Sequence, residues 1–165
     1  DGGPLKLFES GAILQHLEDH HSGEDRTAAE RSLTSQWLLF ANATLAIALF
    51  VPSNREREFP RLMEELNRQL GSGGPLVGNR WGAADCAVSA YLGYLPIFFP
   101  QEDLTPYPAV QELITATQHR PAYRRVMGLD QISLVRERAR GTVCASVSPA
   151  SAHQCRKNGA MSLWL

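Results

Sequence analysis

Hydrophobic positions along this chain recur mainly at the spacing of one helix face, and the pattern predicts a mostly helical fold. The expected helices cover about residues 10–19, 27–50, 56–70, 82–99, 107–119 and 121–127. Pro60 falls within one of these segments, so that helix should either kink at Pro60 or begin close to it. The segment 82–99 is apolar nearly all round, which is typical of an interior helix wrapped by others.

A short segment before the first helix is expected to form a β-strand, Leu5 to Glu9, which turns at once into the helix. Ser10 stands where an N-cap belongs. A helix N-terminus exposes unpaired N–H groups and the positive end of the helix dipole, so it can hold a carboxylate or a phosphate. Ser10 adds a hydroxyl donor, and Glu9 adds a charge that could hold an ammonium group. The pair suits an α-amino-acid end, although an ordinary capping serine beside a solvated acid is the simpler interpretation when the motif stands alone.

A second helix start, at Gly82 to Asp85, is interpreted as structural. Asp85 occupies the third helical position, from which its carboxylate can accept the N–H of Gly82 as in a capping box. Trp81 can pack on Cys86 as a hydrophobic staple. Gly82 lacks the usual capping hydroxyl. This is a mild defect, because glycine at the cap position costs only about a few tenths of a kcal/mol of helix stability. Cys86 is expected to be a small core residue rather than a nucleophile.

Length, charge and cysteine content limit the classes of protein to which the chain can belong. The 165 residues can bury one sizeable core, and a net charge of −1 gives no reason to expect nucleic acid or an anionic membrane as partner. No stretch is expected to span a bilayer, the run Leu45 to Val51 being too short. The N-terminus lacks a signal-peptide pattern, so a cytoplasmic location is the default expectation. The cysteines form no C-x-x-C pair, and no disulfide framework is expected.

Two further patterns are discounted as sites. His16 and His20 lie four residues apart, a spacing that can hold zinc. Because there is no H-E-x-x-H motif and no evident third ligand, an exposed polar helix face is favoured, and no metal is expected. The sequence Asn42-Ala43-Thr44 matches the glycosylation sequon but falls within an apolar helix of a chain without a secretion signal.

Motifs in a particular order resemble the cytosolic glutathione transferase family. The run Glu9-Ser10-x-Ala12-Ile13 resembles the end of its thioredoxin-like domain, where the Glu-Ser pair grips the γ-glutamyl end of glutathione. The stretch 76–87 looks like the one that opens the central helix of its all-helical domain. The stretches 36–40, 106–110 and 120–123 also fit. The resemblance implies a mainly α fold, a glutathione-transferase C-terminal-like helical bundle preceded by a short strand and helix.

By this resemblance, residues 1–22 are a remnant of a thioredoxin-like, glutathione-binding domain and residues 23–128 the helical domain. Residues 129–165 match nothing in the family and are expected to be a poorly ordered tail. The chain begins after the place where the family keeps its catalytic Ser, Tyr or Cys. We therefore expect no catalytic residue in it and no activity by itself.

The resemblance also implies a function. The complete protein would conjugate glutathione to hydrophobic electrophiles or use it to reduce small oxidants, with Glu9 and Ser10 orienting glutathione as co-substrate. Trp37 and Phe40 are either core residues or the border of the pocket for a small hydrophobic electrophile. Family members are commonly dimers, so the resemblance also implies a homodimer as one possible assembly of this chain. The alternative is a non-enzymatic docking module, as in translation elongation factor or aminoacyl-tRNA synthetase complexes.

Overall fold

A computed structural model of the chain describes residues 3–23 and 25–128. This part of the chain is mostly helical, which confirms the predicted fold class. It contains no β-strand, so the strand predicted over Leu5 to Glu9 is not formed there. An extended segment becomes a strand only when a neighbour pairs with its backbone, and no described segment does so. The tail predicted over 129–165 lies outside the described residues.

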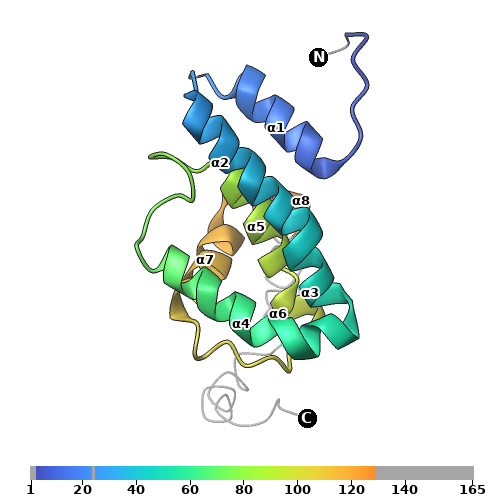
Figure 1. The fold of residues 1–165 in the computed structure, drawn as a ribbon, viewed down its shortest axis with the longest axis vertical. Coiled ribbons are helices and arrows are strands. Elements are labelled where there is room, and N and C mark those ends of the chain that lie inside the picture. The colour runs from blue at the N-terminus through green and yellow to red at the C-terminus, as the bar shows by residue number, and fades with distance from the viewer. Residues whose placement is uncertain (1–2, 24, 129–165) are drawn as a thin grey trace, which may run out of the picture. The chain divides into compact units, whose positions relative to one another are not determined.

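The chain divides into two units, Asp1–His119 and Arg120–Leu165. In the first unit, drawn as a ribbon in Figure 1, the helices are α1 (Ser10–His21), α2 (Ala28–Leu39), the π-helix η1 (Phe40–Leu45), α3 (Ala46–Phe50), α4 (Pro52–Leu70), α5 (Ala83–Leu92), α6 (Leu95–Phe98) and α7 (Pro108–His119). The described part of the second unit contains α8 (Pro121–Val126).

The segment predicted as one helix over 27–50 is α2, η1 and α3 joined end to end (Figure 1). An 18-residue window of this 23-residue helix has a mean hydropathy of 1.5, and by length and composition the helix is long and apolar enough to cross a membrane. The expectation that no stretch could do so is therefore wrong, because it considered only the consecutive apolar run. Leu38, Leu45 and Leu49 of this helix are buried in the core of the bundle, and core helices pass the same compositional test.

Two predicted helix boundaries differ from those observed, each for a reason that involves proline. α4 begins at Pro52, in the first turn where proline is favoured, and continues through Pro60 rather than starting there. The predicted helix over 82–99 is interrupted between Leu92 and Leu95. Pro96 has no N–H with which to continue the helical hydrogen bonds back to Leu92, so the chain turns and starts the short helix α6.

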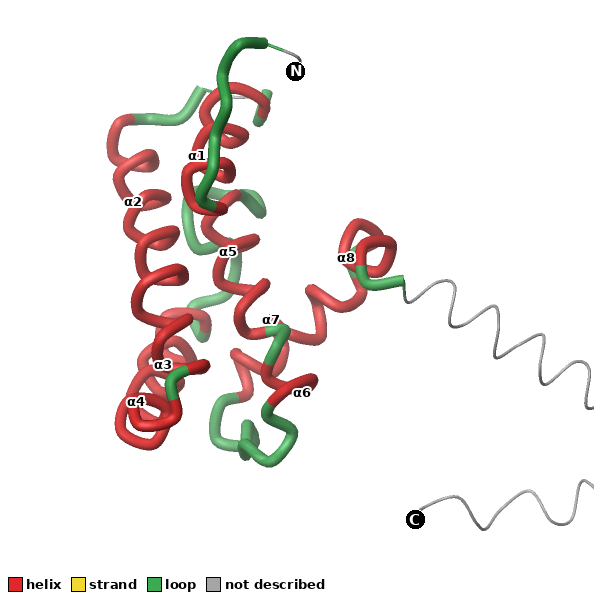
Figure 2. The backbone as a smooth tube through the Cα atoms, turned by 90° about the vertical axis from the view of Figure 1, so that its right-hand side faces the viewer, coloured by secondary structure: helices red, strands yellow, loops and turns green. Residues whose placement is uncertain are grey.

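α5 lies at the centre of the bundle, in contact with α1, α2, η1 and α7. Figure 2 shows α1 and α2 running alongside it. Its buried residues are Ala83, Ala84, Asp85, Ala87, Val88, Ser89 and Leu92. Cys86 and Ala90 lie four residues apart on the remaining face and are exposed. The prediction that Cys86 is a core residue is therefore wrong.

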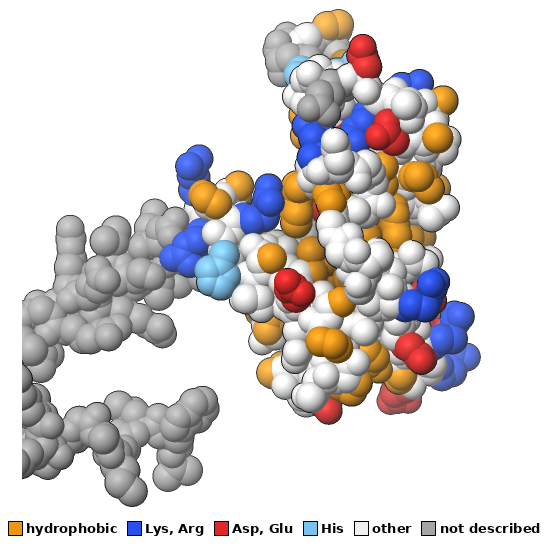
Figure 3. All heavy atoms as spheres, turned by 90° about the vertical axis from the view of Figure 1, so that its left-hand side faces the viewer, with side chains coloured by type: hydrophobic (Ala, Val, Ile, Leu, Met, Phe, Trp, Pro, Cys, Tyr) orange, Lys and Arg blue, Asp and Glu red, His pale blue; other side chains and the backbone are white. Residues whose placement is uncertain are grey.

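The long helix leaves part of its apolar surface uncovered. Leu39, Ile47 and Phe50 are 69%, 47% and 45% exposed. Figure 3 shows one face of the molecule, on which hydrophobic side chains lie among the charged ones. Exposed apolar side chains can mark a surface that binds another molecule where they form a contiguous patch, whereas single ones are ordinary on a protein surface.

Two carboxylates hold the start of α5. The N–H of Gly82 donates to Asp85 Oδ2 at 3.0 Å, and the N–H of Leu76 donates to Asp85 Oδ1 at 2.9 Å. The N–H of Ala83 donates to Glu18 Oε2, also at 3.0 Å. Glu18 belongs to α1, so another helix supplies the cap that Gly82, having no side chain, cannot provide.

Glu18 also forms a buried ion pair with Arg26, in the turn before α2. Arg26 Nη2 lies 2.5 Å from Glu18 Oε1, and the two side chains are 5% and 7% exposed. Two glycines leave room for this pair. A Cβ on Gly82 would lie 3.0 Å from Glu18 Oε1, and a Cβ on Gly78 would lie 2.7 Å from Arg26 Nη1. Gly82 is therefore not a mild defect, because its missing side chain lets Glu18 reach the helix.

Asp85 titrates differently from an exposed aspartate. Burial raises its pKa, more than the hydrogen bonds from Leu76 and Gly82 lower it, and the nearby charge of Glu18 adds to the rise. The native state then holds this proton more tightly than the unfolded chain does. The part of the stability that comes from this tighter proton binding is accordingly full below about pH 4 and is lost as the pH rises through the raised pKa, whereas the hydrogen bonds from Leu76 and Gly82 also form with the ionised carboxylate.

We predict that Asp85→Ala lowers the free energy of unfolding by about 2 kcal/mol or more. The variant leaves two backbone N–H groups without their acceptor, and each such loss costs about 1–3 kcal/mol. Urea denaturation followed by circular dichroism measures the change. A variant as stable as the parent would contradict the structural role assigned to Asp85.

We also predict that Glu18→Ala and Arg26→Ala are each strongly destabilising, by about 3 kcal/mol or more, because each leaves a buried charge without its partner. The double variant should lose much less free energy of unfolding than the sum of the two single variants. A double-mutant cycle of urea denaturation measures this difference. Glu58→Ala is the matched control, since its ion pair with Arg61 is exposed and should contribute little. Additive losses at Glu18 and Arg26 would show that the pair is not coupled.

Candidate functional site

The segment that leads into α1 is extended and exposed. Leu5 is 56% exposed and Phe8 81% exposed. Glu9 has φ 69° and ψ 118°, and among the described residues it is the only one other than glycine with a positive φ. Strained backbone of this kind persists only where the surroundings hold it, and it often marks functional positions.

The first turn of α1 differs from the sequence prediction in its register. Ser10 is the first helical residue, and Glu9 occupies the cap position, with its C=O accepting the N–H of Ile13 at 3.0 Å. The prediction of Ser10 as the N-cap is therefore wrong. No side chain caps this end of the helix, so the N–H groups of its first turn have no side-chain acceptor within the described chain.

The hydroxyl of Ser10 donates instead to Asn42 Oδ1, at 3.5 Å. Asn42 lies in the π-helix η1, and π-helical turns are frequent at functional sites. α1 can approach this closely because residue 11 is glycine, since a Cβ there would lie 2.7 Å from Asn42 Nδ2. From the sequence, Asn42 was considered only as a glycosylation acceptor. The signal that could have identified it is its position as a polar residue in a largely apolar part of the helix.

A hollow of about 440 Å³ lies beside this helix start, between α1 and α2. Its lining residues are Glu9, Gly11, Ala12, Gln15, Ser35, Leu38, Leu39 and Asn42. The hollow therefore combines one carboxylate, side-chain amides, the uncapped helix start and an apolar wall. Such a site can hold a small molecule that carries both an ammonium and a carboxylate group.

Trp37 and Phe40 lie elsewhere on the same long helix. Their rings are half-buried against the core and meet edge to face, with centroids 5.5 Å apart. They line a separate hollow of about 370 Å³, between α2 and α4, that shares no residue with the one beside Glu9. Glu65 lies at the edge of this second hollow, where hydrogen bonds from Arg68 and Gln69 lower its pKa to about 2.

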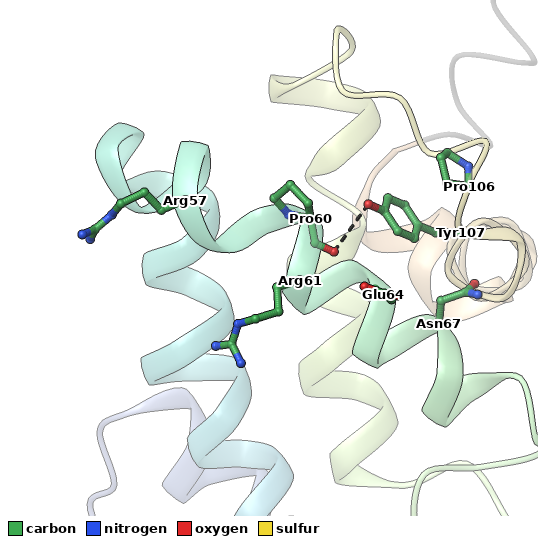
Figure 4. Close-up of a pocket in the computed structure, with 7 residues that line it drawn as sticks. All are labelled: Arg57, Pro60, Arg61, Glu64, Asn67, Pro106 and Tyr107. Carbon is green, nitrogen blue, oxygen red and sulfur yellow. Dashed lines mark hydrogen bonds between the residues drawn. The ribbon is translucent and has the colours of Figure 1, made fainter.

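A larger hollow, of about 540 Å³, opens between α4 and the turn that precedes α7 (Figure 4). The Tyr107 hydroxyl donates to the carbonyl oxygen of Pro60 at 3.4 Å across it. Figure 4 shows the side chains of Arg57 and Arg61 pointing away from Tyr107. None of the residues predicted as functional lines this hollow.

The predicted structural residues and the histidines lie away from Glu9. Trp81 and Cys86 line a common hollow of about 330 Å³, and the staple between them stays a prediction. His16 and His20 have ring centroids 4.6 Å apart. No group of three or more His, Cys, Asp or Glu side chains in the described part of the chain is arranged to hold a metal ion.

Comparison with known proteins shows which family the chain resembles. A family model described as "Glutathione S-transferase, C-terminal domain" matches residues 12–116. The chain is 28% identical over 145 residues to "Glutathione S-transferase-like protein OpS6" of Beauveria bassiana. It is 34% identical over 142 residues to "Disulfide-bond oxidoreductase YfcG" of Escherichia coli. Both alignments cover 74% of this chain, and they cover 66% and 64% of the relatives, so the chain spans just under two thirds of their length.

Two solved structures share the fold. They are Ure2p5 from Phanerochaete chrysosporium cocrystallized with 1-(S-glutathionyl)-2,4-dinitrobenzene and another structure of the glutathione transferase URE2P5 from that organism. The TM-scores are 0.58 and 0.59 at 19% identity, over 78% and 80% of this chain and 70% and 69% of the other chains. Because the matched family model extends over more than half of its residues, the chain belongs to the glutathione S-transferase family and contains the helical C-terminal domain.

Proposed function

We propose that the whole protein conjugates glutathione to hydrophobic electrophiles, and that Glu9 and Ser10 orient the γ-glutamyl end of the tripeptide. The family supports glutathione as the ligand. The observation that carries the assignment to these two residues is the uncapped start of α1, which opens beside the hollow that Glu9 lines. A cytoplasmic location remains a proposal based on the lack of a signal-peptide pattern in this sequence, and homodimerisation remains a proposal based on the family resemblance.

The chemistry of the hollow matches the two charges of a γ-glutamyl end. In our proposal the α-carboxylate lies at the first turn of α1, where backbone N–H groups donate to it. The Ser10 hydroxyl, which donates to Asn42 Oδ1 over a long 3.5 Å in the free chain, turns to donate to this carboxylate instead. The α-ammonium group lies against the Glu9 carboxylate. These contacts bind and orient glutathione. They do not activate its sulfur, because that step needs a donor near the thiolate.

The rest of the reaction involves an electrophile and a thiol-activating group. Leu38 and Leu39 share the hollow with Glu9, and we propose them as the apolar wall that an electrophile contacts first. Trp37 and Phe40, in the separate hollow, remain candidates for a hydrophobic ligand. We propose that the thiol-activating donor belongs to the part of the whole protein that corresponds to the remaining third of the relatives.

A second reaction is supported by a different observation. The relative that is 34% identical is named a disulfide-bond oxidoreductase. Glutathione held in the same way could reduce a small disulfide, with its thiolate attacking one sulfur and the other sulfur leaving as a thiol. Assays of the whole protein with 1-chloro-2,4-dinitrobenzene and with hydroxyethyl disulfide distinguish conjugation from disulfide reduction.

We predict that glutathione binds to this chain and that Ser10→Ala weakens the binding about tenfold or more. A hydrogen bond to a charged group contributes about 1.5–3 kcal/mol, and each 1.4 kcal/mol corresponds to about a tenfold change in affinity. Titration followed by ¹⁵N-resolved NMR measures the dissociation constant even when binding is weak. The amide signals of residues 9–12 should shift.

Ser32→Ala is the matched control, because Ser32 is exposed on α2 and its hydroxyl donates to the carbonyl of Ala28. It should bind glutathione as the parent does. Equal affinity in the Ser10→Ala variant and the parent would remove Ser10 from the site. A parent chain whose amide signals do not respond to glutathione would remove the site itself.

A further inference from the structure

We propose that Asn42 is a further ligand-binding residue of this site, and that its side-chain amide donates to the α-carboxylate of the γ-glutamyl group. The inference rests on the proposed function and adds to it a group from the helical domain. The site would then be formed by two segments that are far apart in the sequence, the start of α1 and the π-helix η1.

The position of Asn42 supports this role. Its Oδ1 is 3.5 Å from the Ser10 hydroxyl, at the outer limit of a hydrogen bond. Its Nδ2 lies over the first turn of α1, where a Cβ on Gly11 would be only 2.7 Å away. The amide nitrogen therefore lies against the first turn of α1 at Gly11, and Asn42 lines the hollow beside the uncapped helix start.

The other uncharged polar side chains of the hollow, Ser35 and Gln15, are already engaged in hydrogen bonds. Ser35 donates its hydroxyl to Gln15 Oε1 at 2.8 Å, and Gln15 donates its amide to Asp19 Oδ2 at 3.1 Å. Asn42 Nδ2 makes no comparable bond to the described residues. Of the two amide side chains that line the hollow, Asn42 is therefore the one with neither N–H engaged within the described part of the chain.

The charge of the hollow favours a neutral donor at this position. Neither lysine nor arginine is among the lining residues, and Glu9 contributes a negative charge. A ligand carboxylate must therefore be held by the helix start and by uncharged donors such as Ser10 and Asn42. A consequence is selectivity for ligands whose γ-linked residue carries a free α-carboxylate.

Two variants and two ligands test the inference. Asn42→Ala removes the amide, whereas Asn42→Asp keeps an oxygen that can accept from Ser10 but replaces the donor with a negative charge. The ligands are glutathione and 4-aminobutyryl-cysteinylglycine, which lacks only the α-carboxylate of the γ-glutamyl residue. Affinities come from NMR titration of the full chain, so that the folded state of each variant is seen in the same spectra.

We expect Asn42→Ala to weaken glutathione binding about tenfold and Asn42→Asp to weaken it at least as much. For the analogue without the carboxylate, each variant should differ from the parent by less than about twofold. Thr44→Ala, an exposed position on the same π-helix, is the control and should bind both ligands as the parent does.

Three outcomes would overturn the inference. Unchanged glutathione affinity in both Asn42 variants would do so, and if Ser10→Ala still weakened binding, the proposed function would stand without Asn42. Equal losses for the two ligands would show that Asn42 acts only by supporting α1. A parent chain that binds neither ligand would overturn the proposed function and this inference together.

Discussion

The carboxylate of Glu18 connects three parts of the bundle, and the arrangement of its helices depends on this contact. One oxygen accepts the N–H of Ala83 at the start of α5, and the other pairs with Arg26 in the turn before α2. The carboxylate is buried, so it is stable there only while both partners are present. Moving α1 away from α5 would therefore leave a buried charge and an unpaired N–H. Gly78 and Gly82 provide the space that this arrangement needs.

The same helix that carries Glu18 carries the proposed ligand site at its other end. α1 runs from Ser10 to His21, so fixing Glu18 against α5 also determines where its first turn lies. That turn then meets the π-helix of the neighbouring segment, with Gly11 beneath the amide of Asn42. A contact between α1 and α5 thus sets the distance between Ser10 and Asn42, and hence the shape of the hollow.

The sequence allowed local features to be predicted and missed those that join distant segments. The helical pattern and the position of Asp85 follow from periodicity and from capping rules, which act within a few residues. Glu18 and Ala83 are 65 residues apart, and nothing in the spacing around Glu18 indicates that a charge there is buried. Gly82 was misinterpreted for the same reason, since its missing side chain matters only when Glu18 is beside it.

The site shows the same limit. Glu9 and Ser10 were found because they start a helix and carry complementary chemistry. The helix start was predicted one residue too far along, because a capping pattern does not reveal the positive φ of Glu9. Asn42 was not recognised as a partner, since it reaches Ser10 only through a π-helical turn and a glycine opposite. Cys86 was placed in the core because the helix around it is apolar, although its side chain is exposed.

Amide hydrogen exchange in the Glu18→Gln variant tests this account most directly. Glutamine keeps the shape and an acceptor oxygen but removes the charge that pairs with Arg26. The account predicts that the amides of α1 and of Ala83 lose protection in the variant, while the interior amides of α5 around Val88 and Leu92 keep theirs. Unchanged protection throughout α1 would show that Glu18 does not hold this helix to the bundle.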